Sequence, residues 1–561
     1  MAVRRIGQRV TFLWCFVWVS GASAQTASNA ASLRPEVLPY ENESDLIIAQ
    51  DSHGAYLRNG DTGTIILGPG PPVDEIFERA FLHLDDAGGG RVHVKSGTYT
   101  FVNPAVLGGK SHISIVGDHG TVLTGPDNTG AVFQVVNGST DVTIADLRFA
   151  HCAGKGINVQ DASDVRITGC VFEEIGEDAV QIAIPQDGVY VERLWITGCR
   201  FRGGEAESDS AAVHAYEVRD LFVLNNVIES WGRGGFNIQK SSGRVVIADN
   251  TIGLTGFVEG ACEDQIVEGY CGVAPSNGIY VGSGTASVTV RGNHVHDCGG
   301  IGIEASSGVG LGSQFVICDN VFLRNGLVGG GASGTNHGGG IYITGSHHTV
   351  TNNICAENGG TGIQLGYGED AQHILVHGNV IADNAQYESG AGISMNAPSE
   401  GNGFSHVQDV AIRDNLITNE AGTQDYGIRC SATTRADGNL YWADGVLIEG
   451  NRISGHGVQQ IWWPVEAEQI IVRGNVGFAS ASRGDATIAA GDQFVIVAHG
   501  LDFDLVGVAP DPTQVQVTPT SELDSGVCWW VSDVTDTSFT INTSDVAPTG
   551  GSTFNWVCVE R

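Results

Sequence analysis

Residues 245–252 read VVIADNTI, and the same pattern returns as VTVRGNHV at 288–295, ILVHGNVI at 374–381 and VAIRDNLI at 410–417. Each phrase has apolar residues at alternate positions, then a short polar turn that ends in Asn, then a second alternation. Because an alternation with a period of two over so few positions is typical of β-strands, each phrase predicts two short strands joined by a tight turn.

A second phrase, Gly-Ile-x-apolar, alternates with the first along the chain, as in GIYV at 278–281, GIYI at 340–343 and GIQL at 362–365. In a strand, successive side chains point to opposite faces, so the Ile and the second apolar residue are expected inside and the x residue outside. The small residue before each of these strands, such as Gly235, Gly278 or Gly302, is expected to let a polymer approach the backbone.

The spacing of the recurrent Asn residues indicates one coil per repeat. Asn226 and Asn250 are 24 residues apart, and the 43 residues from Asn250 to Asn293 contain a Gly-rich insertion. A fixed period with insertions at one place in the cycle indicates a solenoid. We expect the coils to stack in parallel about 4.8 Å apart. The Asn should sit at the bend, where it tolerates the left-handed conformation, and bond the Asn of the next coil.

The repeat resembles the pectate-lyase superfamily of right-handed parallel β-helices. The start of the chain agrees, because residues 73–87 predict a short amphipathic helix, followed by GGGRVHVKSGTY at 88–99 and ISIVGD at 113–118. That order is similar to the capping helix and first coil of the rhamnogalacturonase and epimerase-like branch. The expected fold class is therefore all-β: a right-handed parallel β-helix with an N-terminal capping helix and a small C-terminal β-domain.

The sequence predicts four segments. Residues 1–24 have the positive start, the apolar run and the Ala22-Ser23-Ala24 end of a signal peptide. An N-terminal extension is expected at 25–70, the β-helix at 71–482 and the C-terminal β-domain at 483–561. The last segment has candidate strands at 494–498, 514–518, 528–532 and 538–542. It resembles modules of phage tail and exported β-helix proteins. The protein is therefore expected to be a monomer or a homotrimer.

Composition excludes several partners. The formal net charge of −35 excludes nucleic acid, whose phosphates need clustered Lys and Arg. No apolar run is long enough for stable insertion into a membrane. With the signal peptide removed, the mature protein is expected to be secreted, extracellular or periplasmic.

Cysteines are expected in two roles. Cys170 and Cys199 recur in the phrase Ile-Thr-Gly-Cys, which predicts stacked interior thiols. Cys528 and Cys558 fall in two expected strands of the C-terminal segment and are candidates for a disulfide, since an exported chain meets oxidising conditions. The His347-His348 pair lacks metal-site spacing and is expected in a loop.

The outward x positions build one column when the coils are stacked. It is rich in amides and aromatic rings, which bind sugars through hydroxyl groups and ring faces, and a side-chain ladder that only stabilises the sheet is the alternative. The column predicts binding of an extended polysaccharide, and its members are Asn158, Gln181, His214, Asn237, Tyr280, Glu304, Tyr342, Gln364, Ser394, Arg429 and Trp462.

Four carboxylates crowd the run EEIGEDAVQI at 173–182, just before one of these strands. Such crowding is costly unless a cation or a proton is shared. The run is similar to the Glu-Asp-Ala segment of one pectate lyase group, in which acids bind Ca²⁺, so Glu174, Glu177 and Asp178 are predicted calcium ligands. A solvated acidic turn and an acid/base pair are the alternatives.

The favoured reaction is proton abstraction at C5 of a uronate, as in a polysaccharide lyase or a C5-epimerase. It needs a base, an acid and a group that neutralises the carboxylate. His214 is the predicted base, Tyr280 the acid, and Lys240 or Arg233 the neutralising cation.

Two other functions stay open. A glycoside hydrolase on the same scaffold would use Glu177, Asp178 and Glu304, and the Gly-Glu-Asp-Ala segment is similar to the Gly-Asp-Asp-Cys segment of polygalacturonases. Lys155 stands where those enzymes place an Asp, which argues against that version. The third possibility is a non-catalytic, glycan-binding adhesin or tail-type protein.

Overall fold

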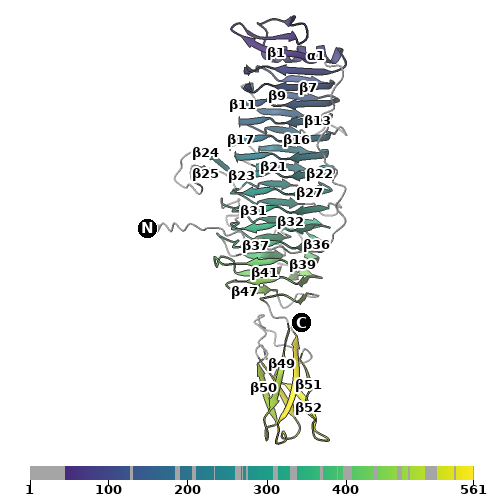
Figure 1. The fold of residues 1–561 in the computed structure, drawn as a ribbon, viewed down its shortest axis with the longest axis vertical. Helices are drawn as coiled ribbons and strands as arrows, with labels where there is room; N and C mark the ends of the chain where they lie inside the picture. Colours follow the sequence, from purple (N-terminus) through teal and green to yellow (C-terminus); the bar gives the residue numbers. More distant parts are fainter. Residues whose placement is uncertain are drawn as a thin grey trace, which may run out of the picture. The chain divides into compact units, whose positions relative to one another are not determined.

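The computed structural model describes residues 45–126, 130–182, 190–204, 210–232, 234–259, 267, 270–272, 276–282, 284–306, 314–328, 338–366, 370–387, 390–395, 407–430, 433–434, 440–441, 443–463, 470–477, 481–498, 515–535 and 538–559. The described residues form strands and one helix, α1 (Figure 1). No described helix has both the length and the apolar character that crossing a bilayer requires. The predicted signal peptide lies outside the described residues.

Three parallel sheets, which we call A, B and C, make up the main body, and each coil contributes a strand to each sheet in most of the stack (Figure 1). Sheet A holds β1 (Asp45–Asp51), β4 (Gly90–Val94), β7 (Ser111–Gly117), β10 (Ser139–Ala145), β13 (Ala162–Thr168), β16 (Glu192–Thr197), β19 (Arg219–Leu224), β22 (Ser242–Ala248), β27 (Val288–Arg291), β30 (Phe315–Cys318), β33 (Thr349–Thr351), β36 (Ala371–His377), β39 (Val407–Arg413), β44 (Ala443–Asp444), β45 (Leu447–Glu449) and β48 (Ile471–Arg473).

Sheet B holds β5 (Gly97–Thr100), β8 (Thr121–Thr124), β11 (Arg148–Cys152), β14 (Val171–Ile175), β17 (Arg200–Gly204), β20 (Val227–Trp231), β23 (Thr251–Gly253), β28 (His294–His296), β31 (Val321–Leu323), β34 (Ile354–Ala356), β37 (Val380–Ala382), β40 (Leu416–Thr418) and β46 (Arg452–Ser454). Sheet C holds β6 (Ala105–Gly108), β9 (Ala131–Val136), β12 (Lys155–Val159), β15 (Val180–Ile182), β18 (Ala211–Tyr216), β21 (Gly234–Gln239), β26 (Ile279–Val281), β29 (Ile303–Ser306), β32 (Ile341–Ser346), β35 (Ile363–Leu365), β38 (Ala391–Met395), β41 (Tyr426–Cys430) and β47 (Gln459–Trp462). This stacking confirms the predicted parallel β-helix.

The predicted capping helix is also confirmed. Helix α1 (Val73–Asp86) buries Ile76, Phe77, Ala80, Phe81 and Leu84 at the start of the β-helix. The ring of Phe77 packs against those of Phe101 and Phe133, with centroids 5.2 and 5.5 Å apart. Burial of such side chains contributes about 1.5–3 kcal/mol each, so the helix closes an end of the core that would otherwise face water.

The predicted Asn ladder forms inside the turn between sheets A and B. Each ladder Asn except the last donates its backbone N–H and its Nδ2 to Oδ1 of the next, at 2.9–3.1 Å, and the series is Asn226, Asn250, Asn293, Asn320, Asn353, Asn379, Asn415, Asn451 and Asn475. The predicted conformation is wrong, however. The left-handed residue is the one before each Asn, such as Asp249 or Asn352, with φ of 57° and 55°. The ladder Asn residues point inward, and all of them except Asn475 are buried.

Cys170 and Cys199 occupy the position of the ladder Asn in the preceding coils. Both are buried, as predicted, and the backbone N–H of Cys199 donates to Oδ1 of Asn226 at 2.9 Å. Burial holds the pKa of the Cys170 thiol well above its ordinary value. These thiols therefore act as small apolar side chains that continue the column toward the first coils.

The glycines before the strands of sheet C have a different role from the one predicted. A Cβ on Gly235 would lie 2.3 Å from the carbonyl oxygen of Gly278 in the next coil and 2.9 Å from Cγ2 of Ile252. Gly278 and Gly302 are buried in the same way, against the carbonyls of Gly302 and Gly340. These glycines permit close stacking of coils; they do not open the outer face to a polymer.

The segment predicted as an N-terminal extension contains strands. β1 pairs antiparallel with β2 (Gly54–Asn59) and parallel with β4, and β2 pairs with β3 (Ile65–Leu67). Hairpins also form between β24 (Phe257–Glu259) and β25 (Tyr270–Gly272), and between β42 (Thr433–Thr434) and β43 (Leu440–Tyr441).

The C-terminal residues form two antiparallel sheets with their own core. One contains β49 (Ala481–Ile488), β54 (Ser552–Val559) and β51 (Val515–Pro519), and the other contains β50 (Phe494–Ala498), β53 (Ser538–Thr543) and β52 (Trp529–Ser532). The four predicted strands are present within a residue or so. The predicted disulfide is wrong: Cys528 is an exposed free thiol beside β52, whereas Cys558 is buried in β54 of the other sheet.

Candidate functional site

The outward column forms on sheet C. Strand pairing puts Asn158 opposite Gln181, and then in turn His214, Asn237, Tyr280, Glu304, Tyr342, Gln364, Ser394, Arg429 and Trp462. Gln134 of β9 extends the column by one coil before Asn158. Every one of these side chains is partly exposed except Ser394, which is 4% exposed.

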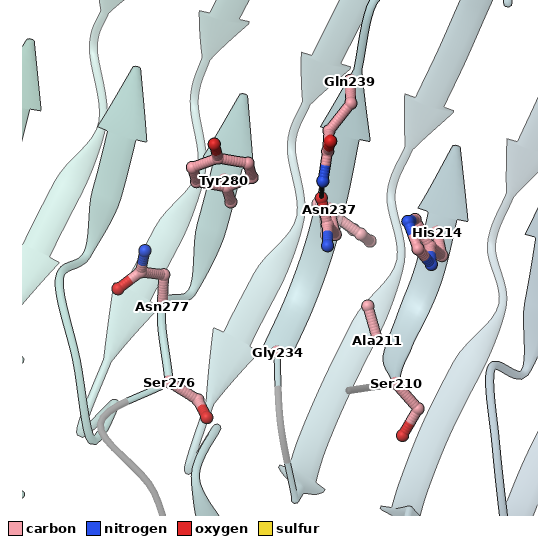
Figure 2. Close-up of a pocket in the computed structure, with 10 residues that line it drawn as sticks. Ser210, Ala211, His214, Gly234, Asn237, Gln239, Ser276, Asn277 and Tyr280 are labelled. Carbon is pink, nitrogen blue, oxygen red and sulfur yellow. Dashed lines mark hydrogen bonds between the residues drawn. The ribbon is translucent and has the colours of Figure 1, made fainter. Parts of the chain in front are cut away.

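A groove of about 460 Å³ opens on this column. Figure 2 shows His214, Asn237 and Tyr280 side by side on β18, β21 and β26. Ser210, Ser276 and Asn277 precede these strands, Gly234 is the first residue of β21, and Gln239 is its last. Among the described residues that line the groove, none is Lys or Arg.

His214 is held by a buried carboxylate. Nδ1 of His214 lies 3.3 Å from Oδ2 of Asp178, which is 4% exposed. Because an ionised carboxylate can only accept hydrogen bonds, this contact puts the imidazole proton on Nδ1 and leaves the lone pair of neutral His214 on Nε2. A lone pair on an outward-facing imidazole is what a general base needs.

Asp178 also has two other donors. The backbone N–H of Ala211 donates to Oδ1 at 2.8 Å, and Nε2 of Gln181 donates to Oδ2 at 2.9 Å. Hydrogen bonds to a carboxylate stabilise its charged form. Gln181, predicted as a sugar-binding residue, therefore helps to fix the carboxylate that orients His214.

The other carboxylates of the acidic run point to separate partners. Glu177 pairs with Lys155 of the preceding coil, and Glu174 is exposed and lies 2.6 Å from Nδ1 of His151. Within the ranges that the structure describes, no three His, Cys, Asp or Glu side chains come together in a way that would hold a metal ion. The calcium site stays a prediction, and the contacts of Asp178 favour a different role for that residue.

Of the two predicted cations, the structure describes only Lys240. The ammonium of Lys240, at the end of β21, lies 4.9 Å from the centre of the Tyr216 ring, and the Tyr216 hydroxyl raises the pKa of Lys240. Lys240 is not among the described residues that line the groove. Arg233 lies outside the described residues.

The C-terminal part of the column has its own contacts. Oε2 of Glu304 accepts a hydrogen bond from Nδ2 of Asn277 at 2.7 Å. The guanidinium of Arg429 lies 5.2 Å from the ring centre of Tyr426 and 5.7 Å from that of Trp462. Tyr342 and Gln364 lie between these groups on β32 and β35. The column therefore passes from the imidazole and phenol groups of the groove to an aromatic cluster.

Sequence reasoning missed the residues that line the lower edge of the groove. Asn277 directly precedes the Gly-Ile-Tyr-Val phrase, and its Oδ1 accepts the backbone N–H of Ile301 at 2.9 Å. The position before the Gly could therefore have been predicted as a site residue, because it contributes a side chain to the edge of sheet C. Asp178 was singled out for its charge, but its contact with His214, 36 residues later, has no local signature.

Solved structures align with this chain at low identity, with TM-scores below 0.5. The A-module of the mannuronan C-5 epimerase AlgE4 from Azotobacter vinelandii aligns with 71% of this chain and 96% of its own, at 16% identity and a TM-score of 0.43. The tailspike protein of E. coli bacteriophage HK620, solved in complex with a pentasaccharide, aligns with 89% of this chain and 92% of its own, at 12% identity and a TM-score of 0.43. PfbA, a surface adhesin of Streptococcus pneumoniae, aligns with 66% of this chain and 90% of its own, at 13% identity and a TM-score of 0.34. The likeness concerns the fold alone.

No curated protein sequence matches the chain. The family model of the right handed beta helix region matches residues 131–266 and 273–484, which is more than half of the chain. Its two segments span the strands that carry the Asn ladder and most of the column on sheet C. The chain therefore belongs to the right-handed β-helix family.

Proposed function

We propose that this chain binds an extended polysaccharide along sheet C and abstracts the C5 proton of a uronate residue in the groove, with His214 as base and Tyr280 as acid. The observation that carries the proposal is the His214 imidazole, held at Nδ1 by buried Asp178 on the outward face of a continuous column of amides and rings. A base oriented by a buried carboxylate and open to a groove has the geometry that proton abstraction requires.

The spacing of the groove suits a sugar ring. His214 and Tyr280 stand two coils apart with Asn237 between them, which separates their backbones by roughly 10 Å. A sugar that lies over Asn237 has the imidazole on one side and the phenol on the other. The Asn237 amide is oriented by Nε2 of Gln239, which donates to Oδ1 at 2.9 Å, so Nδ2 faces the sugar as a donor.

The proposed reaction removes one proton from the substrate and delivers another. Nε2 of His214 takes the C5 proton, and the electron pair enters the adjacent carboxylate system. In a lyase the pair then expels O4, which takes a proton from Tyr280. In an epimerase Tyr280 returns a proton to the other face of C5. Each acid–base group of this kind increases the reaction rate by about 10²–10⁴-fold.

The hydrolase has less support from the geometry. Of its three carboxylates, Glu177 pairs with Lys155, Asp178 has three donors and Glu304 is bonded to Asn277. A hydrolase needs two carboxyl groups that face one glycosidic bond. We therefore favour proton abstraction.

Exchange of the C5 proton with solvent tests the proposal for lyase and epimerase alike. The full chain would be incubated in D₂O with pectate, alginate and glycosaminoglycans, with Ca²⁺ or with chelator, and the polymer analysed by NMR for deuterium at C5 and by absorbance for unsaturated ends. We expect deuterium or unsaturation on one polymer, and loss of both in His214→Ala. The matched control is His373→Ala, which removes an exposed imidazole beside Asp409 on sheet A.

A polymer that binds along the column without exchange or unsaturation would contradict the catalytic part and leave a binding protein of the adhesin type. Equal activity of His214→Ala and the wild type would remove His214 as the base.

A further inference from the structure

One face of the C-terminal sheet β50–β53–β52 carries large apolar side chains that are exposed. Phe494 of β50 and Trp530 of β52 each stand directly opposite Asn542 of the central strand β53. Directly opposed residues of an antiparallel pair share a face, so the three side chains form one row across the sheet. The other face of the same sheet packs Phe539 and Ile541 into the core.

The exposure of this row is unusual for such side chains. Phe494 is 56% exposed, Trp530 is 48% exposed and Ile496, the next outward residue of β50, is 64% exposed. Single exposed apolar residues are ordinary, but two rings and an isoleucine on one flat face indicate a binding surface. We call this surface, made of Phe494, Ile496, Trp530 and Asn542, the C-terminal platform.

The polar part of the platform is oriented in advance. Nδ2 of Asn542 donates to Oγ of Ser532 at 2.8 Å, and Oγ of Ser532 donates to Oδ2 of Asp533 at 2.8 Å. This chain of donors turns Oδ1 of Asn542 away from Ser532, where it can accept a hydrogen bond from a ligand hydroxyl. An oriented acceptor between two rings suits a ligand with flat C–H faces and hydroxyl edges.

The spacing of the rings suits a polymer of such units. Phe494 and Trp530 lie two strand spacings apart, roughly 10 Å, which is close to the length of two sugar residues in an extended chain. Each ring can therefore stack on alternate sugars while Asn542 faces the hydroxyl groups of the sugar between them.

Charge argues against other partners. Residues 481–561 contain eleven Asp and Glu but only two Arg and no Lys. A second copy of the chain would bring the same excess of negative charge to the platform, and an anionic polymer would also be repelled. We propose that the C-terminal platform binds an uncharged polysaccharide, at a site separate from the groove of His214. This inference does not rest on the proposed function.

Depletion binding of the full chain tests the proposal. The probes are microcrystalline cellulose, chitin, insoluble mannan and starch granules, with bound protein measured against free protein. We expect the wild type to bind at least one of them and Phe494→Ala/Trp530→Ala to bind it at least tenfold more weakly. Val546→Ala, which removes a 52% exposed side chain outside the platform, and His214→Ala should both bind like the wild type.

Trp530→Phe keeps a ring and should retain most of the binding, which separates loss of stacking from loss of folding. The proposal is overturned if no probe binds the wild type, or if the double variant and the wild type bind alike. It is also overturned if the double variant lowers the mass of the particle in solution by light scattering, because the platform would then join copies of the chain. The deuterium assay with His214→Ala reports on the groove separately.

Discussion

Asn320 illustrates how much a single side chain does in this fold. It is 1% exposed, its Nδ2 donates to the backbone oxygen of Val290 and to Oδ1 of Asn353, and its own Oδ1 accepts from Asn293. Each rung thus satisfies backbone groups that the turn between sheets would otherwise bury without partners. The ladder replaces the backbone pairing that a sharp turn cannot provide.

Asn320→Ala should therefore lower the free energy of unfolding by about 2–4 kcal/mol, because several buried groups lose their partners together. The midpoint of urea unfolding measures the change. Asn352→Gly is the control, since Asn352 is exposed with φ of 55° and glycine adopts that conformation without strain. An equal loss in both variants would contradict the role given to the ladder.

Asp178 acts through His214 and is a positioning residue. In Asp178→Asn, the new side-chain NH₂ group would face the donors Ala211 N–H and Gln181 Nε2, which now bond the carboxylate. The variant would also no longer hold the imidazole with its proton on Nδ1. We expect kcat for C5 exchange to fall about 10²-fold with little change in KM. Glu177→Gln is the matched control, because Glu177 pairs with Lys155 instead of a groove residue. A fall in both variants would indicate a general effect of charge in the acidic run.

At the scale of the element, packing of one coil on the next sets which residues are tolerated. Gly234 and Gly235 are neighbours at the start of β21, yet a Cβ on Gly235 would meet a carbonyl oxygen at 2.3 Å and one on Gly234 would meet its nearest atom at 3.7 Å. A methyl group on Gly235 would therefore push the next coil away, whereas one on Gly234 would make an ordinary van der Waals contact.

We expect Gly235→Ala to destabilise the protein by about 1–3 kcal/mol and Gly234→Ala to change stability by less than about 0.5 kcal/mol. Thermal and urea unfolding of the two variants measure the difference. Similar stability of both would show that the coils adjust more easily than the contacts imply.

The loop between β32 and β33 holds a second kind of buried contact. His348 lies in a loop, as predicted, but it is 1% exposed, accepts the backbone N–H of Phe315 at Nδ1 and donates from Nε2 to the carbonyl oxygen of Thr344. Burial lowers the pKa of His348 to about 4, so the folded protein holds it neutral.

Since the unfolded chain protonates His348 near pH 6.5, its contribution to stability is complete above that pH and is lost as the pH falls toward 4, by about 3 kcal/mol in all. Urea midpoints at pH 7 and 4.5 measure the loss. His348→Gln, which does not titrate, should lose less stability over the same range. An unchanged pH dependence in the variant would assign the acid sensitivity to other groups.

At the scale of the whole molecule, charge and substrate oppose each other. A chain with a net charge of −35 repels a polyuronate at long range. If the substrate is a polyuronate, kcat/KM should rise between about 10 and 150 mM NaCl, because the Debye length falls from about 30 to about 8 Å. A fall over this range would point to a local cation that attracts the polymer.

The sequence predicted the order of the column on sheet C, because each Gly-Ile-x-apolar phrase carries its own alternation and the Asn spacing sets the register between coils. It did not predict the partners of the acidic run. The contacts of Glu177 with Lys155 and of Asp178 with His214 join residues 22 and 36 positions apart, and these depend on which side chains the neighbouring coils happen to offer.

Each ladder Asn makes the same bonds whether its coil is 24 residues long, as from Asn226 to Asn250, or 43, as from Asn250 to Asn293. A gene that duplicates or drops one complete coil therefore leaves every remaining rung with a partner above and below. Insertions in the connecting loops leave the rungs untouched. Such a lineage can lengthen or shorten its binding face in whole coils, and can diversify the loops beside it, while each intermediate protein still folds.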